Sequence, residues 1–308
     1  MKHIHESYKG VVVPMASPVD AKGEIDVSGA GKLIDYLHEH QAVPFIMGTN
    51  GEASSLSLKN RKDLIRVLID HKKTGVPLIA GVIGLPFRET IEQSNAYFDM
   101  GLDAVVLTLP NYYGLNNRQM LHYFRSVAER VDGNVILYNI PKTIHMSLPV
   151  EVIEELSYEE NLIGIKDSEF DESRLDASLT LWKDRSDFFH LTGVNKLMVK
   201  GLLNGSRGIV PSTGNFAPGI YNDLYRLCLE KRLDEATTLL ARTQELCDIY
   251  QESSTLADSV AALKVVLAYQ GFCTKEVLPP LLKATAEQEK AIIDKYNKTI
   301  LKENGACS

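Results

Sequence analysis

The chain has 308 residues, of which 44% are hydrophobic and 24% are charged, and its formal net charge is −7. These values describe an ordinary globular protein that is long for one domain but within the range of α/β barrels. The acidic balance argues against a nucleic-acid partner or an anionic membrane surface. No apolar stretch approaches the length of a transmembrane helix.

The cysteines and the start of the chain predict a cytoplasmic protein. Cys228, Cys247, Cys273 and Cys307 all lie in the last third, without the spacing of a zinc site or a disulfide framework. Reduced cysteines of this kind are typical of the cytosol. The first residues, Met1–Glu6, lack the apolar core of a signal peptide.

Eight short apolar segments recur along the chain and predict strands. In chain order they are Gly10–Met15, Val43–Met47, Pro77–Val82, Ala104–Leu109, Val135–Asn139, Leu162–Lys166, Phe188–Thr192 and Gly208–Val210. They are apolar throughout, as parallel strands buried on both faces are.

The segments between these strands are amphipathic. Asn60–Lys73 carries its leucines and isoleucines on one helical face, and Glu89–Met100 is followed by Gly101, a natural helix stop. Eight strand–helix units predict an α/β fold, a (β/α)₈ TIM barrel.

The strand signals stop after about Pro218, and the rest of the chain predicts helices. These are Tyr221–Lys231, Leu233–Gln251, Ser259–Tyr269 and Glu287–Leu301. We therefore expect residues 1–218 to form the barrel that carries the active site, and residues 219–308 to form a C-terminal helical region.

Lys166 ends the sixth predicted strand as a single amine after an apolar run. In barrels of this type the chemistry lies at the carboxyl ends of the strands. A desolvated pocket disfavours the charged amine, and the neutral amine is a nucleophile that forms a Schiff base with a ketone. The alternative from this segment alone is a lysine that reaches solvent. No metal is expected, because the strand ends carry no His or carboxylate cluster with metal-ligand spacing.

Three segments at the strand ends are specific in combination. They are Gly48-Thr49-Asn50-Gly51-Glu52, Tyr138-Asn139-Ile140-Pro141 and Gly164-Ile165-Lys166-Asp167. In this order, on an eight-unit barrel, they resemble the dihydrodipicolinate synthase / N-acetylneuraminate lyase family of Schiff-base pyruvate aldolases. The resemblance runs from Gly10 to about Pro280. It implies a carbon–carbon lyase that needs no cofactor, because a covalent imine on Lys166 is the electron sink.

The resemblance also implies the catalytic residues. Lys166 would condense with the keto carbon of pyruvate or another 2-oxo acid, and Tyr138 would move protons to and from the substrate. Thr49 would relay protons to that tyrosine. Tyr112, with Tyr113 as the alternative, would enter the active site of a neighbouring subunit. The implied assembly is a homotetramer built as a dimer of dimers.

The turn after the second strand is the predicted site for the carboxylate of the 2-oxo acid. Gly48, Thr49 and Asn50 would bind it, largely through backbone N–H groups. Asn50 stands where the family commonly has a hydroxyl, so its amide can donate a hydrogen bond but cannot relay a proton. Glu52 is expected to hold the turn through backbone N–H groups.

The remaining predicted substrate-binding residues are Thr143, Gly193 and Val210. Thr143 stands where dihydrodipicolinate synthases carry an arginine, and the adjacent lysine is not an equivalent bidentate group. This departure disfavours lysine-pathway synthesis.

Two further segments bear on the other substrates of the family, one by departing from a pattern and one by resembling it. Gly193 is followed by Val194-Asn195-Lys196, where sialic acid lyases carry an acidic pair. The segment Ser212–Pro218 resembles members that act on 2-keto-3-deoxy sugar acids. Whether Lys196 and His145 contact substrate or lie at the surface is left open.

We therefore expect a class I aldolase that reversibly cleaves a 2-keto-3-deoxy sugar acid into pyruvate and an aldehyde. The alternatives within the family are N-acetylneuraminate lyase, dihydrodipicolinate synthase and a 2-keto-3-deoxy acid dehydratase. The alternative outside enzymes is a paralogue that binds a 2-oxo acid with little or no catalysis. The sequence does not fix the chain length or stereochemistry of the substrate, or the direction of the reaction in the cell.

Overall fold

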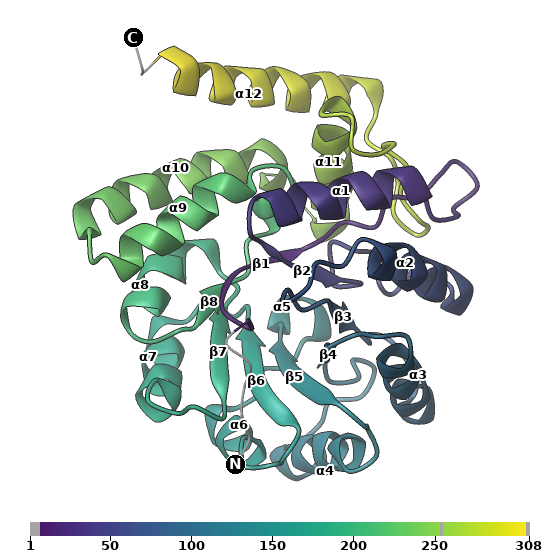
Figure 1. Ribbon diagram of the computed structural model, residues 1–308, viewed down its shortest axis with the longest axis vertical. Helices are drawn as coiled ribbons and strands as arrows, with labels where there is room; N and C mark the ends of the chain where they lie inside the picture. Colours follow the sequence, from purple (N-terminus) through teal and green to yellow (C-terminus); the bar gives the residue numbers. More distant parts are fainter. Residues whose placement is uncertain (1–6, 253–254, 306–308) are drawn as a thin grey trace.

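The computed structural model describes residues 7–252 and 255–305 as a closed barrel of parallel strands surrounded by helices (Figure 1). Its strands are Gly10–Pro14 (β1), Val43–Ile46 (β2), Ile79–Gly81 (β3), Ala104–Leu107 (β4), Asn134–Asn139 (β5), Leu162–Asp167 (β6), Phe189–Thr192 (β7) and Gly208–Ile209 (β8). They pair in sequence order, and β8 pairs with β1 to close the ring. The predicted TIM barrel is confirmed, and all eight predicted strands are present.

Helices connect the strands and cover the barrel. They are Val27–Glu39 (α1), Leu58–Asp70 (α2), Phe87–Asp99 (α3), Asn117–Ala128 (α4), Pro141–Ile144 (α5), Val150–Leu156 (α6), Glu172–Trp182 (α7), Met198–Leu203 (α8) and Pro218–Leu229 (α9). Short 3₁₀ turns lie at Asn195–Leu197 (η1) and Ser212–Asn215 (η2). Several starts are fixed by a side chain that accepts a backbone N–H of the first turn, as Ser57 does for α2 and Asp171 for α7.

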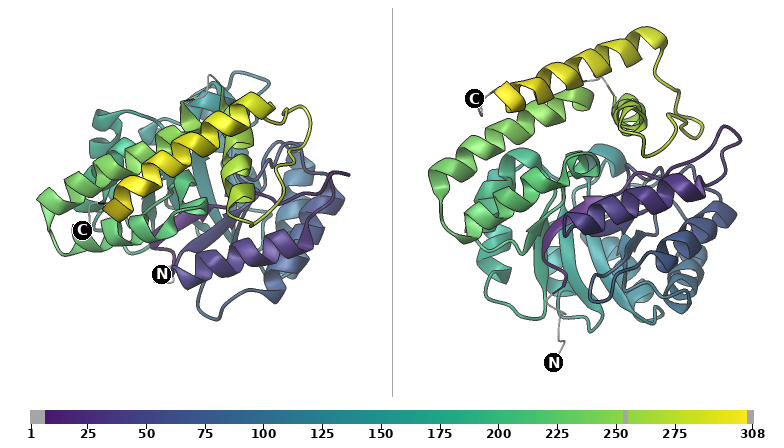
Figure 2. Two further views of the ribbon diagram at one scale, coloured as in Figure 1. Left: turned by 90° about the horizontal axis from the view of Figure 1, so that it is seen from above. Right: turned by 45° about the horizontal axis from the view of Figure 1, so that its top comes forward.

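The C-terminal helices are Leu233–Gln251 (α10), Leu256–Tyr269 (α11) and Ala286–Gly305 (α12). Figures 1 and 2 show them stacked beside the barrel, with α12 lying over α10 and α11. α9 follows β8 and contacts β1, so it completes the helical ring of the barrel. The division of the chain into domains at residue 218 stays a prediction.

The strands are buried along their whole length except at the first residue of β1 and of β5. Burial on both faces explains why apolar runs, and not alternation, mark them in the sequence. The last strand is tied to the first by Asn215, whose Oδ1 accepts from Ala16 N at 2.8 Å and whose Nδ2 donates to Pro14 O at 2.9 Å. The segment after β8 therefore helps to close the ring.

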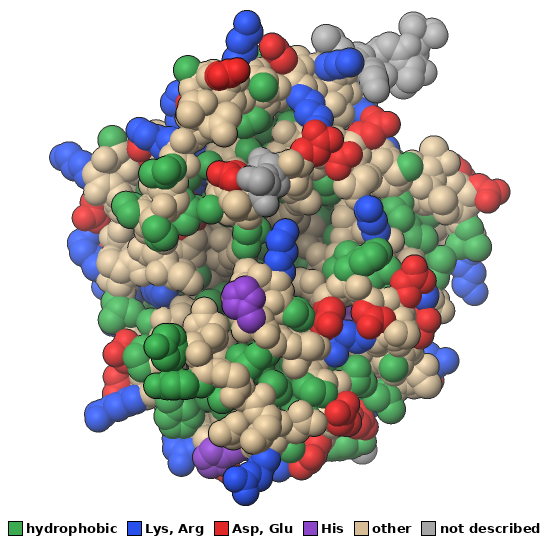
Figure 3. Space-filling model, turned by 180° about the vertical axis from the view of Figure 1, so that it is seen from behind, with side chains coloured by type: hydrophobic (Ala, Val, Ile, Leu, Met, Phe, Trp, Pro, Cys, Tyr) green, Lys and Arg blue, Asp and Glu red, His purple; other side chains and the backbone are tan. Residues whose placement is uncertain are grey.

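The face seen in Figure 3 is hollowed near its middle, and acidic and basic side chains are intermixed around the hollow. None of the helices in the described ranges is both long and apolar enough to cross a bilayer. Cys228, Cys247 and Cys273 are free thiols, whereas Cys307 lies outside the described residues. The cytoplasmic location stays a prediction.

Candidate active site

Lys166 lies near the end of β6 and its side chain is buried, with 5% of the residue exposed. Its Nζ lies 3.9 Å from the centre of the Tyr138 ring. Tyr138 is the residue paired with Lys166 across β5 and β6, and it is buried as well. The structure therefore brings the two main predicted catalytic residues together in the interior of the barrel.

Phe45 of β2 supplies a second ring beside the amine. Lys166 Nζ lies 4.8 Å from the centre of the Phe45 ring, which meets the Tyr138 ring edge-on at 6.5 Å. Aromatic faces attract a cation, so both rings favour a positive charge on this nitrogen. An imine of Lys166 carries such a charge when protonated. Nothing in the sequence marks Phe45, because a phenylalanine within an apolar run is indistinguishable from a packed strand residue.

The turn between β2 and α2 has an unusual backbone. Met47 and Glu52 both have a φ of 52°, in the left-handed region that disfavours side chains. Gly81 at the end of β3 is required by this turn, because a Cβ there would lie 2.1 Å from Met47 O. Each residue other than glycine in this left-handed conformation lowers the stability of the fold by about 1 kcal/mol. Other contacts must therefore hold the turn.

Glu52 and Lys264 provide such a contact. Lys264 Nζ lies 2.8 Å from Glu52 Oε1, and both side chains are fully buried. The same ammonium donates to Ser17 O at 2.6 Å and to Glu276 O at 2.8 Å, and Leu278 N donates to Glu52 Oε2 at 2.6 Å. Glu52 thus binds the C-terminal region, whereas the sequence had suggested only that it holds its own turn. α11 is thereby joined to the turn that carries Thr49.

Two adjoining cavities open at this end of the barrel. One of about 250 Å³ is lined by Gly48, Thr49, Thr143 and α11, and one of about 490 Å³ is lined by Thr49, Thr143 and Tyr112 among others. The structure therefore brings these four predicted residues to one mouth. Thr143 Oγ1 donates to Ile140 O at 3.2 Å, at the start of α5.

Tyr112 and Tyr113 are the most exposed aromatic pair of the barrel mouth. They are 86% and 71% exposed, and their rings meet edge-on with centres 5.0 Å apart. Both line the larger cavity, so their placement fits either choice of the residue offered to a neighbouring subunit. Large exposed aromatic side chains are common at protein interfaces.

The remaining predicted binding residues are Asn50, in the turn after β2, Gly193, directly after β7, and Val210, directly after β8. Asn50 is half-buried in the turn after β2. Gly193 N donates to Asp167 O at 2.7 Å, and Val210 N donates to Thr192 O at 2.9 Å, so both amides are engaged by neighbouring strands. Their roles in binding substrate stay predictions.

The two residues left open by the sequence are both exposed. Lys196 lies in η1 with its side chain exposed, whereas the preceding Asn195 is bonded to Thr243 of α10 and accepts from Tyr221 OH. His145 ends α5 with a φ of 56°. This left-handed backbone explains why glycine suits that position.

Another cavity, of about 620 Å³, lies at the opposite end of the barrel near Tyr8, Asp103 and Asn134, where β1, β4 and β5 begin. In (β/α)₈ enzymes the active site is built at the carboxyl ends of the strands, and the other end contributes to stability. The described residues contain no group of three His, Cys, Asp or Glu side chains able to hold a metal ion. We therefore place the candidate site at the carboxyl ends of the strands, where Lys166 lies beside Tyr138 and Thr49 lines both mouth cavities.

The fold and the site are those of a (β/α)₈ enzyme in which a buried lysine lies beside a buried tyrosine. Residues 7–299 match the dihydrodipicolinate synthetase family, so the chain belongs to that family. Its relatives include "Uncharacterized DapA-like lyase" of Thermococcus onnurineus, 30% identical over 95% of this chain and 99% of the relative. A 4-hydroxy-tetrahydrodipicolinate synthase of Ectopseudomonas mendocina is 32% identical over 79% of this chain and 82% of its own. The protein is therefore a pyruvate-dependent carbon–carbon lyase.

A third relative is YagE of Escherichia coli K12, whose name assigns it provisionally as a 2-dehydro-3-deoxy-D-gluconate aldolase. It is 29% identical over 89% of this chain and 91% of its own. The solved structure of YagE in complex with pyruvate has a TM-score of 0.88, with 27% identity over 96% of this chain and 99% of that one. A dihydrodipicolinate synthase of Bacteroides thetaiotaomicron has a TM-score of 0.89 at 24% identity, over 94% and 98% of the two chains, which shows the shared fold.

Proposed function

We propose that the protein is a class I aldolase that reversibly cleaves a 2-keto-3-deoxy sugar acid into pyruvate and an aldehyde. The observation that carries this proposal is the buried Lys166 amine, 3.9 Å from the centre of the Tyr138 ring. The aromatic faces of Tyr138 and Phe45 would stabilise the iminium cation that the reaction forms on this nitrogen. The same imine is the electron sink, so the proposed chemistry requires neither a metal nor an organic cofactor.

The proposed reaction begins when Lys166 Nζ attacks the keto carbon and water leaves, which forms the iminium. Tyr138, with Thr49 as a relay, takes the proton of the hydroxyl on the carbon that becomes the aldehyde. The carbon–carbon bond then breaks, and its electron pair moves into the iminium to give an enamine. The enamine carbon takes a proton, and water hydrolyses the imine to release pyruvate and the free lysine.

The larger mouth cavity supports a substrate with an uncharged, hydroxylated tail. Among its lining residues, all within the described chain, there is no Asp, Glu, Lys, Arg or His. The hydroxyls of Thr49, Ser54 and Thr143 line it beside Ile83 and Leu85. A charged aldehyde would lose its hydration there without a partner, whereas a sugar hydroxyl can exchange water for these groups. The provisional name of YagE points to the same substrate class.

We also propose that the active form is a homotetramer in which Tyr112, or its neighbour Tyr113, reaches the mouth of an adjacent subunit. The support is the exposure of both rings at the rim of the larger cavity.

The first test is to reduce a mixture of protein and pyruvate with borohydride and to measure the intact mass. We expect the mass of one reduced pyruvate on the wild type and no adduct on Lys166→Ala. Lys142→Ala is the matched control, because Lys142 is an exposed lysine of the neighbouring α5. An adduct that persists in Lys166→Ala would contradict the assignment of the amine.

The second test is a substrate panel read by pyruvate release or consumption. We expect cleavage of 2-keto-3-deoxygluconate and slower or no cleavage of N-acetylneuraminate. We also expect little condensation of pyruvate with aspartate semialdehyde. Preference for either of the last two substrates would replace the sugar-acid proposal, and release of water without carbon–carbon cleavage would indicate a dehydratase. An adduct with no turnover on any substrate would favour a protein that only binds 2-oxo acids.

A further inference from the structure

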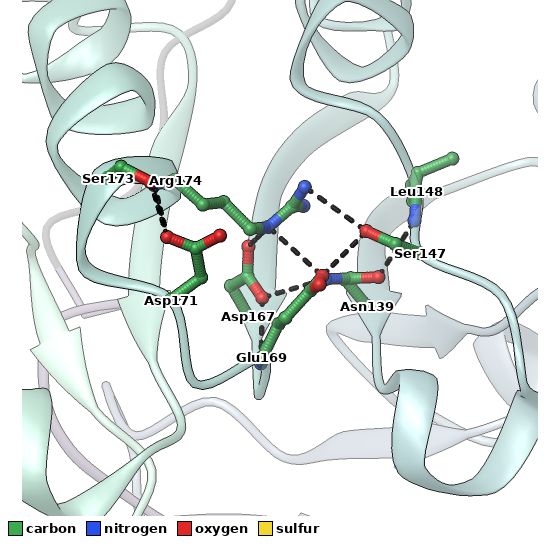
Figure 4. Close-up of polar contacts among 8 residues, drawn as sticks. All are labelled: Asn139, Ser147, Leu148, Asp167, Glu169, Asp171, Ser173 and Arg174. Carbon is green, nitrogen blue, oxygen red and sulfur yellow. Dashed lines mark hydrogen bonds and ion pairs between the residues drawn. The ribbon is translucent and has the colours of Figure 1, made fainter.

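A polar network lies on the outer side of the strands that carry the two reactive residues (Figure 4). In the pairing of β5 with β6, Tyr138 is opposite Lys166, and Asn139 is opposite Asp167. Side chains alternate along a strand, so the first pair points into the barrel and the second pair points toward the helices. Each reactive residue is therefore the direct chain neighbour of a residue of the network.

Asn139 joins the ends of the two strands. Its Nδ2 donates to Asp167 Oδ1 and to Glu169 Oε2, both at 2.9 Å, and its Oδ1 accepts from Leu148 N at 2.9 Å. Its backbone carbonyl accepts from Ser168 N, also at 2.9 Å. The side chain thus bonds to β6, to the segment after β6 and to the segment after α5. A residue with this many fixed partners holds the spacing of β5 and β6.

Arg174, in the first turn of α7, is the positively charged residue of this network. Its Nε lies 2.7 Å from Asp167 Oδ2 and 3.5 Å from Glu169 Oε2. The Arg174 and Asp167 side chains are 9% and 7% exposed, so solvent screens their attraction little. Ser147 Oγ donates to Glu169 Oε2 at 2.6 Å and accepts from Arg174 Nη1 at 3.4 Å. Asp171 fixes the helix start by accepting from Arg174 N at 3.1 Å.

We infer that Asn139, Asp167 and Arg174 are positioning residues for the imine chemistry, an inference that rests on the proposed function. They touch no reacting atom. They hold the ends of β5 and β6 so that Lys166 Nζ stays beside the Tyr138 ring at the geometry that attack on a ketone requires. A displacement of about 1 Å at a reacting group can lower a rate about 100-fold. The Arg174 guanidinium thereby links the first turn of α7 to Asp167, the residue that follows Lys166 in the chain.

The test replaces Arg174 and follows imine formation in a single turnover with pyruvate, quenched with borohydride. For Arg174→Gln we expect imine formation to slow about 10- to 100-fold. The KM for the substrate should change much less, because its carboxylate is expected at the turn Gly48–Asn50, which the network does not contact. Arg174→Lys should recover part of the rate, because an ammonium can pair with one oxygen of Asp167.

The matched control is Lys200→Met. Lys200 of α8 lies 2.9 Å from Glu172 and 2.9 Å from Asp176, both on α7, and these pairs are exposed. The variant removes ion pairs of the same helix without touching the network. We expect its imine formation to equal that of the wild type.

The outcomes separate this inference from the proposed function. If the wild type forms no adduct, the proposed function fails. If the wild type reacts and Arg174→Gln reacts equally fast, the inference is wrong. It is also wrong if the rate falls only in proportion to the folded fraction measured by circular dichroism. If Arg174→Gln does not fold, Asp167→Asn is the second variant, because it keeps an oxygen for Asn139, and the same slowing with the same KM is required of it.

Discussion

At the scale of single residues, the proposed activity depends on an amine held beside two aromatic rings. Both ring faces would stabilise the positive charge of a protonated imine on this nitrogen, which suits the proposed intermediate. That Lys166 reacts with a ketone stays a prediction. As a candidate it could be singled out from the sequence, because it follows an apolar run and lies in one of three strand-end segments that together resemble a known aldolase family. Phe45 could not, because nothing local distinguishes it from the rest of the core.

The hydroxyl of Tyr138 should matter more than its ring. Tyr138→Phe keeps the ring beside Lys166 and removes the group that transfers protons. We expect kcat for cleavage to fall about 10²- to 10⁴-fold, the usual contribution of a positioned acid–base group. The pyruvate adduct should still form. Steady-state kinetics combined with borohydride trapping measure both.

Tyr123→Phe is the control for this change, since Tyr123 of α4 lines the larger mouth cavity, whereas the rings beside the amine are those of Phe45 and Tyr138. It should retain nearly full activity. Unchanged kcat in Tyr138→Phe would show that this phenol transfers no proton in the slow step.

At the scale of elements, the barrel could be predicted well from the sequence, whereas the ion pairs between residues far apart in the chain could not. Strands buried on both faces are apolar runs, so β6 was predicted to within one residue, and α10 was predicted at its observed bounds. The ion pair between Lys264 and Glu52, for example, joins residues far apart in the chain. No periodicity or spacing marks them, because each partner alone resembles a surface charge. Arg174 was missed for the same reason.

The ion pair between Lys264 and Glu52 should be essential for stability. Lys264→Met leaves a carboxylate buried without its partner, which costs roughly 3–5 kcal/mol of unfolding free energy. The double variant Glu52→Gln/Lys264→Met should recover part of that loss, because no charge remains buried. Urea unfolding measured on the single and double variants checks both statements.

Lys275→Met offers a matched comparison, because Lys275 forms a half-exposed ion pair with Glu289. Surface pairs contribute about 0–1 kcal/mol, so this variant should lose little. Equal losses in Lys264→Met and Lys275→Met would mean that the buried pair is no more important than a surface pair.

At the scale of the whole molecule, acid stability should depend on His190. Burial lowers the pKa of His190 to about 4, with Asp167 raising it and Arg174 lowering it to smaller extents. Between this pKa and the ordinary value of 6.5, the unfolded chain binds a proton that the folded chain does not. The contribution of His190 to the free energy of unfolding is therefore fully present above pH 6.5 and is lost as the pH is lowered toward 4.

From about pH 7 to about pH 5, this linkage predicts a loss of about 2 kcal/mol of unfolding free energy. His190→Gln should show a smaller loss over the same interval, whereas His122→Gln, which changes an exposed histidine, should behave as the wild type. Urea unfolding at the two pH values measures the difference. The same acid loss in His190→Gln and the wild type would assign it to other groups.

The whole molecule also shows why the substrate is harder to predict than the fold. Family membership follows from a match over residues 7–299, and the barrel brings Lys166 beside Tyr138. In the proposed function, the choice of substrate depends on a few residues such as Thr143 and Asn50, which depart from the pattern that the resemblance implies. The proposed assembly would add Tyr112 or Tyr113 of a neighbouring subunit to that mouth.

The most direct test of the central claim is peptide mapping of the borohydride-reduced adduct with pyruvate. Lys166 is the one lysine proposed to react, and it is buried, whereas many other lysines are exposed and more accessible. We predict one reduced pyruvate, on the peptide that contains Lys166. Modification spread over the exposed lysines with an unmodified Lys166 would contradict the account.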